Sequence, residues 1–223
     1  CCCDKCLQPI VTPDGKVSYA RHRGPRAHYN YNYATGVALS ADATIEGFTL
    51  TGGRSSVGTQ SGTASSYKAI GAVCRAQMGG DSSGWKARSL LTDCIITNNF
   101  APDGAGGNHA VFTRCQFLDN PARSSSAFRS VTAVRCLIAD NHAIGEGEYA
   151  TICRYGYASG CVFRNNTATK AIWGASQVSV QCTLDDLSIT NQFYDCNVYN
   201  CVVRVDPRST SKPRNYRGTV RVG

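Results

Sequence analysis

Cysteine and paired Asn or Asp residues recur along the middle of the chain at nearly constant spacing. Each of the four clearest copies has a Cys, an apolar residue two positions later, an Asn or Asp followed by an Asn, and then an Ala. The copies lie 21, 21 and 25 residues apart. Thiols and carboxylates held in register can form disulfides, bind metals or transfer protons. The repeated residues are Cys94, Cys115, Cys136 and Cys161, with Asn99, Asn120, Asn141 and Asn166.

A fixed period near 21 residues sets how these side chains must be positioned. Short apolar pieces such as 109–112 and 130–134 lie between the copies, and no stretch has a sustained 3.6-residue apolar pattern. Units this short cannot bury an apolar face alone, but stacked turns can, with their strands paired in parallel. We therefore predict an all-β fold, a single-stranded parallel β-helix (solenoid) of about seven turns with an N-terminal cap.

The copies at 93–101, 114–122, 135–143 and 160–168 resemble the right-handed parallel β-helix repeat of the pectin-lyase-like superfamily. They are most similar to the Cys- and Asn-laddered repeats of bacterial surface proteins, including the polymorphic outer-membrane protein group. The resemblance covers roughly residues 41–203 and implies a right-handed coil. It does not imply one activity, because this fold hosts lyases, hydrolases, adhesins and phage spikes.

The repeat divides the chain into three segments. Residues 1–40 are expected to form the cap, 41–203 the β-helix, and 204–223 a basic C-terminal tail. We interpret 44–53 as the first copy, with Phe48 in the Cys position, and 73–80 as a degenerate copy containing Cys74. After Cys161 four registers compete, beginning at Cys182, at residue 186, at Cys196 or at Cys201.

The repeated Cys is predicted to fill the interior. Parallel stacking places thiols of neighbouring turns about 5 Å apart at Cα, so inter-turn disulfides are the alternative to small apolar fillers. The chain has 13 Cys, an odd number, which excludes complete internal pairing. A zinc site near the N-terminus would need a second Cys pair close by. Disulfides that pin the cap are instead predicted for Cys1, Cys2, Cys3 and Cys6.

The paired polar residues are predicted to form the corners. Asn tolerates left-handed backbone, and its amide can bond to the same amide one turn away, so we expect Asn99 and its equivalents to be left-handed corner residues. Asp119 and Asp140 occupy the preceding position in adjacent turns. Stacked carboxylates there either cap their own turns or bind a calcium ion. No other cofactor is indicated.

Enzyme chemistry has weak support in the sequence. The residues that flank each repeated Cys form no acidic column, and Asp185-Asp186 near Asp195 is the best acidic cluster for a carboxylate pair. The four His share no nucleophile motif such as Gly-x-Ser-x-Gly. We therefore lean toward a non-enzymatic protein, with a polysaccharide lyase or glycoside hydrolase as the alternative.

Charge and composition limit the classes of partner that the chain can bind. The net charge is +8, with +3 in residues 1–35, +5 in residues 202–223 and a neutral body between them. These ends are solvated segments or contact an acidic surface such as an anionic glycan. No apolar run approaches a membrane span, and the chain has neither an initiator Met nor a signal peptide, which indicates a mature product or an excised fragment. We predict a secreted or bacterial cell-surface, adhesin-like β-helix that assembles head-to-tail into fibres or binds glycans, without specific nucleic-acid binding.

Overall fold

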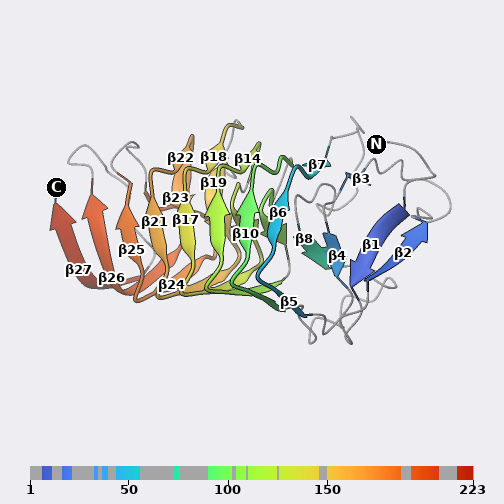
Figure 1. The fold of residues 1–223 in the computed structure, drawn as a ribbon. Coiled ribbons are helices and arrows are strands. Elements are labelled where there is room, and N and C mark those ends of the chain that lie inside the picture. The colour runs from blue at the N-terminus through green and yellow to red at the C-terminus, as the bar shows by residue number, and fades with distance from the viewer. Residues whose placement is uncertain are drawn as a thin grey trace.

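The computed structural model confirms the all-β parallel solenoid, and no helix occurs in the residues it describes (Figure 1). The described residues therefore contain no helix that is long and apolar enough to cross a membrane. The described residues are 7–11, 17–21, 33–34, 37–39, 44–55, 73–75, 90–101, 104–108, 110–124, 126–145, 150–186, 192–205 and 215–222.

Parallel strands form two adjoining walls of one 14-stranded sheet. The first wall contains β5 (Thr44–Glu46), β9 (Leu90–Thr92), β12 (Val111–Thr113), β16 (Thr132–Val134), β20 (Tyr157–Ser159) and β24 (Val178–Val180). The second wall contains β6 (Thr49–Thr51), β10 (Ile95–Thr97), β13 (Gln116–Leu118), β17 (Leu137–Ala139), β21 (Val162–Arg164) and β25 (Thr183–Asp185). Both walls end on the long strands β26 (Asn197–Val205) and β27 (Asn215–Val222).

Further strands close the coil. The third wall contains β1 (Leu7–Val11), β2 (Val17–Arg21), β4 (Val37–Leu39), β8 (Val73–Arg75), β11 (Gly107–Asn108), β15 (Phe128–Arg129), β19 (Thr151–Arg154) and β23 (Ala171–Trp173). A short strip contains β14 (Pro121–Ala122), β18 (His142–Ala143) and β22 (Thr167–Ala168). Outside the coil, β3 (Tyr33–Ala34) pairs with β7 (Arg54–Ser55).

The walls meet at two-residue corners whose first residue has left-handed backbone. Asp93, Arg114 and Arg135, each before a repeated Cys, have φ of 52°, 53° and 53°. Asp119 and Asp140, each before a repeated Asn, have φ of 49° and 55°. The prediction that Asn99, Asn120, Asn141 and Asn166 are themselves left-handed is therefore wrong by one position. The exposed residue turns the chain, and the Asn that follows it points into the interior.

The parallel register settles the order of the copies. Thr183 lies beside Val162 and Val202 beside Thr183, so the turns after Cys161 begin at Cys182 and Cys201. The alternatives beginning at residue 186 and at Cys196 are wrong, since Asn197 lies beside Val178 and Cys196 therefore stands opposite Gln177 at another corner. Cys74 is not a copy of the repeat, since β8 lies in the third wall with Cys74 opposite Asn108. The coil consequently has about five turns rather than the expected seven.

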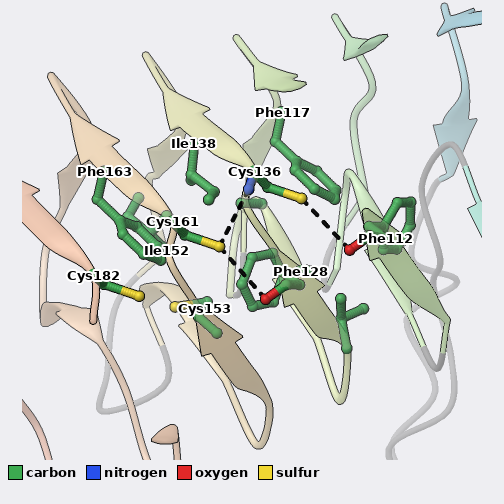
Figure 2. Packing of buried hydrophobic residues seen from close by; sticks show 14 of the residues in the cluster. Phe112, Phe117, Phe128, Cys136, Ile138, Ile152, Cys153, Cys161, Phe163 and Cys182 are labelled. Atoms are coloured by element: carbon green, nitrogen blue, oxygen red, sulfur yellow. Dashed lines mark hydrogen bonds between the residues drawn. The ribbon is translucent and has the colours of Figure 1, made fainter. Parts of the chain in front are cut away.

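Aromatic residues fill the interior between the walls. Phe112 and Phe117 meet edge to face with centroids 4.8 Å apart (Figure 2). Phe163 contacts Trp173 in the same way at 5.3 Å. These side chains are fully buried, as are Ile96, Ile138 and Leu184 of the second wall. Phe48, expected inside, is 62% exposed, although its backbone stands opposite Cys94. The apolar column two positions after the Cys is confirmed.

Substitution of Arg135 tests the corner conformation. This side chain is exposed, so Arg135→Val and Arg135→Gly lose the same charge but differ in tolerance of φ 53°. We expect the Val variant to be less stable than the Gly variant by about 1–2 kcal/mol, because left-handed backbone crowds a β-branched residue. Thermal or urea unfolding measures this difference. Gln116→Val, on an exposed strand position, is the control, and equal stability of both Arg135 variants would contradict a left-handed corner.

Candidate functional site

The repeated Cys form a hydrogen-bonded ladder inside the first corner. The backbone N–H of Cys94 donates to Cys115 Sγ at 3.4 Å. The N–H of Cys136 donates to Cys161 Sγ at 3.4 Å (Figure 2). Each thiol donates in turn to carbonyl oxygens. Cys115 Sγ, for example, lies 3.4 Å from Leu91 O in the preceding turn and 3.4 Å from Thr113 O. The ladder continues from Cys182 to Cys201.

The described thiols are buried and free. Cys94, Cys115, Cys136 and Cys161 are each at most 2% exposed, which confirms their interior position. Disulfides between turns do not occur among the described Cys. Burial raises the pKa of the Cys196 thiol to about 12 and also raises that of Cys153. Neutral thiols in a dry interior are poor nucleophiles and poor metal ligands. The disulfides predicted for Cys1, Cys2, Cys3 and Cys6 lie outside the described residues.

The repeated Asn form an equivalent ladder at the second corner. The Asn120 N–H donates to Asn141 Oδ1 at 3.2 Å, while Asn120 Nδ2 donates to Asn141 Oδ1 at 3.0 Å and to Ile96 O at 2.9 Å. Asn99 and Asn141 repeat this pattern toward their next turns. The predicted amide-to-amide bonding is therefore confirmed, and the side chains of Asn99, Asn120, Asn141 and Asn166 are fully buried.

Gly53 and Asp186 end the Asn ladder. The Gly53 N–H donates to Asn99 Oδ1 at 2.9 Å, so glycine closes the first end without a side chain. At the other end Asp186 accepts the Asn166 N–H at 2.6 Å and Asn166 Nδ2 at 3.1 Å. Asp186 is 1% exposed, and burial raises the pKa of its carboxyl to about 6. A 21-residue step from Asn166 reaches Leu187, so the period alone does not identify Asp186 as the residue that accepts from Asn166.

The acidic cluster considered for catalysis points in two directions. Asp185 faces outward and pairs with Arg204 at 2.9 Å, whereas Asp186 faces the interior. Asp195 is a left-handed corner residue of the first wall, with φ of 51°. A carboxylate pair for glycoside cleavage needs two groups open to one substrate. Asp185 and Asp186 do not provide such a pair.

His142 connects side chains from three successive turns on the outer surface. His142 Nδ1 lies 2.7 Å from Thr167 Oγ1, and His142 Nε2 lies 3.8 Å from Asp119 Oδ1. This order is that of an acid, a base and a hydroxyl, as in nucleophilic catalysis. However, the Asp119 side chain is 66% exposed, and the Thr167 N–H is engaged by Asn141 O. We assign no catalysis to this exposed corner.

The calcium prediction for Asp119 and Asp140 rests on their stacked position, and they do occupy equivalent exposed corners of adjacent turns. Groups of three or more His, Cys, Asp or Glu able to hold a metal do not occur within the described ranges. Two exposed carboxylates supply only part of the six to eight oxygen ligands that calcium takes. Calcium binding here stays a prediction.

The outer face of the first wall differs from that of the second. Two residues point outward from each of six strands of this wall, namely β9, β12, β16, β20, β24 and the start of β26. Each of these residues is at least partly accessible to solvent. These outward residues are uncharged, whereas the second wall carries Arg164, Asp185 and Arg204. The uncharged face, as we call it, consists of Leu90, Thr92, Val111, Thr113, Thr132, Val134, Tyr157, Ser159, Val178, Val180, Asn197 and Tyr199.

Two substitutions at Cys115 distinguish a ladder from an apolar filler. Ser keeps a donor and an acceptor at this buried position, whereas Ala leaves the Cys94 N–H without its partner. We expect Cys115→Ser to be more stable than Cys115→Ala by about 1 kcal/mol, because an unsatisfied buried N–H costs about 1–3 kcal/mol. Chemical denaturation of both variants measures the difference. Greater stability of the Ala variant would mean that the thiol acts as a filler.

Comparisons of the chain with family models, curated proteins and solved structures found no match. The likeness to the pectin-lyase-like superfamily therefore extends to the parallel β-solenoid alone, and a function must be argued from the surface of this molecule.

Proposed function

We propose that this solenoid is a non-enzymatic, surface-displayed module that binds a neutral, extended polysaccharide along its uncharged face. The observation that carries the proposal is the absence of charge from the outward residues of six successive strands in the described first wall. Charged residues return at the flanking strands, with Glu46 on β5 and Arg217 on β27. The strip between them is about 24 Å long at a strand spacing of about 4.8 Å.

The residue types of the uncharged face suit a carbohydrate. Thr92, Thr113 and Ser159 supply hydroxyls that donate and accept hydrogen bonds. Tyr157 and Tyr199 supply rings on which the apolar side of a sugar can pack, together with a phenolic hydroxyl. Val111, Val134, Val178 and Val180 supply partly exposed apolar side chains between these groups. An elongated ligand matches such a face because the side chains at equivalent positions of successive turns form straight rows along the coil.

The same residue types argue against acidic ligands at this face. Recognition of an anionic glycan or a nucleic-acid backbone depends on Lys and Arg, which are missing from these twelve positions. Non-enzymatic binding is favoured over hydrolysis because the acidic groups of the second wall and its corners diverge, with Asp185 outside and Asp186 inside. A rigid interior of bonded ladders suits a module that displays a surface.

Binding of the full chain to insoluble neutral polysaccharides, such as cellulose, chitin and β-1,3-glucan, tests the proposal by co-sedimentation. Val134→Glu places a charge in the centre of the uncharged face and is expected to weaken binding at least tenfold, because desolvating an unpaired charge is costly.

Leu137→Glu is the matched control. Leu137 lies in the same turn and is also half-buried, but it faces outward from the second wall. This variant is expected to bind within about twofold of the unmodified chain. Equal losses in both variants, or retention of the unmodified chain by anionic polysaccharides only, would overturn the proposal.

A further inference from the structure

The two aromatic side chains of the uncharged face both lie in its C-terminal half. Tyr157 belongs to β20 and is 39% exposed, and Tyr199 belongs to β26 and is partly accessible. The outward residues of β9, β12 and β16 include no ring. Tyrosine combines an apolar ring with a hydroxyl, and tyrosines carry a large share of the affinity at many binding surfaces. The strongest contacts of this face are therefore expected over β20, β24 and β26.

The strand register places the two rings on a diagonal of the wall. β24 lies between β20 and β26, so these two strands are about 10 Å apart along the coil, and the two tyrosines differ by one outward position, about 7 Å across the wall. Their backbone positions are thus about 12 Å apart, which is roughly the length of two units of an extended pyranose chain. In register, the six outward residues are Tyr157, Val178 and Asn197 at the first position, and Ser159, Val180 and Tyr199 at the second.

A hydrogen-bonding side chain stands beside each ring. On β26 it is Asn197, whose Oδ1 accepts a bond of 2.7 Å from Asn215 Nδ2 on the outer surface. Because this bond engages Oδ1, the Asn197 amide has its Nδ2 hydrogens for a ligand oxygen. On β20 the hydroxyl of Ser159 takes this part. The order of ring and polar group is reversed between the two strands, so both strands offer stacking and hydrogen bonding, on opposite sides of the diagonal.

The charge of this region favours an uncharged ligand. Within the described first wall, the charged outward residue nearest to the rings is Arg217, which is exposed on β27 and lies beside Tyr199 in the register. The three strands that carry the diagonal have uncharged outward residues. A neutral sugar chain can cover them without leaving a charge desolvated, whereas an anionic chain would place most of its charges against neutral side chains.

We propose that Tyr157 and Tyr199 form a pair of sugar-stacking subsites that selects a neutral β-1,4-linked polysaccharide. This inference rests on the proposed function and names the linkage that the face takes. A β-1,4-linked pyranose chain extends as a flat ribbon in which each unit is turned over relative to the last, so every second unit presents the same face. One such unit stacks on Tyr157 and the next but one on Tyr199, crossing β24 between them. A β-1,3- or α-1,4-linked chain winds, so two of its units do not lie flat on both rings.

Isothermal titration calorimetry of the full chain with soluble hexasaccharides tests the linkage. We expect cellohexaose or the β-1,4-linked hexamer of N-acetylglucosamine to bind at least about tenfold more tightly than laminarihexaose (β-1,3) and maltohexaose (α-1,4). The β-1,4-linked dimer of the same sugar does not span the rings and should bind at least about tenfold more weakly than its hexamer. Equal affinity for the three linkages or for the two lengths, or tighter binding of hexagalacturonate, would contradict the paired subsites.

Substitution of each ring tests its part in the site. Tyr157→Ala and Tyr199→Ala are each expected to weaken binding of the β-1,4-linked hexamer at least about tenfold, whereas Tyr157→Phe keeps the ring and should bind within about threefold of the unmodified chain. Phe48→Ala, which removes an exposed ring at the other end of the coil, is the matched control and should bind within about twofold. Undiminished binding by both Ala variants of tyrosine would refute the subsites. The linkage comparison uses the unmodified chain and decides even where a variant does not fold.

The co-sedimentation assay and the titrations separate this inference from the proposed function. Absence of binding to every insoluble neutral polysaccharide would overturn both. Binding to insoluble neutral polysaccharides without preference among the soluble hexamers, or without binding of any of them, would leave the neutral-glycan face in place and overturn the paired subsites.

Discussion

The N–H group that follows each left-handed corner residue is the constraint on which this solenoid depends. At Asn99, Cys94 and Gly156 this N–H donates to a side-chain atom of the equivalent residue in the next turn. A buried N–H without a partner costs about 1–3 kcal/mol. At these corners an inward polar atom at the same place one turn later satisfies the N–H. This requirement explains why Asn and Cys recur in register, and why Gln177 and Asp186 occupy corresponding places.

Inward residues form the ladders that hold the turns together, whereas outward residues form the surface that is available for function. Inward positions are committed to corner bonds and to packing, so their residue types repeat along the coil. Outward positions carry no such requirement, and the first and second walls differ accordingly in charge. A neutral-glycan face on the first wall is consistent with this division, because it does not disturb the interior bonds of the central turns.

The period and the inward columns could be predicted from sequence because both follow from parallel stacking. The corner conformation was assigned one residue late, because Arg114 and Arg135 are unusual in left-handed backbone and hid the pattern. Cys74 was misplaced because its 20-residue distance from Cys94 imitates the period, although it belongs to another wall. Asp186 was assigned to an acidic cluster and not to the Asn column, because four registers competed after Cys161. The uncharged face was not predicted, since its outward residues are of different types and have only the absence of charge in common.

Hydrogen exchange of the Asn side-chain amides, followed by NMR, tests the ladder most directly. The Nδ2 groups of Asn99, Asn120 and Asn141 each donate to a neighbouring Asn and to backbone carbonyls in a fully buried column. We expect these side-chain protons to exchange at least about a thousandfold more slowly than those of an exposed Asn, because exchange requires the turns to separate. Exchange at the rate of an exposed amide, in a chain that remains folded, would show that the Asn column does not hold the turns together.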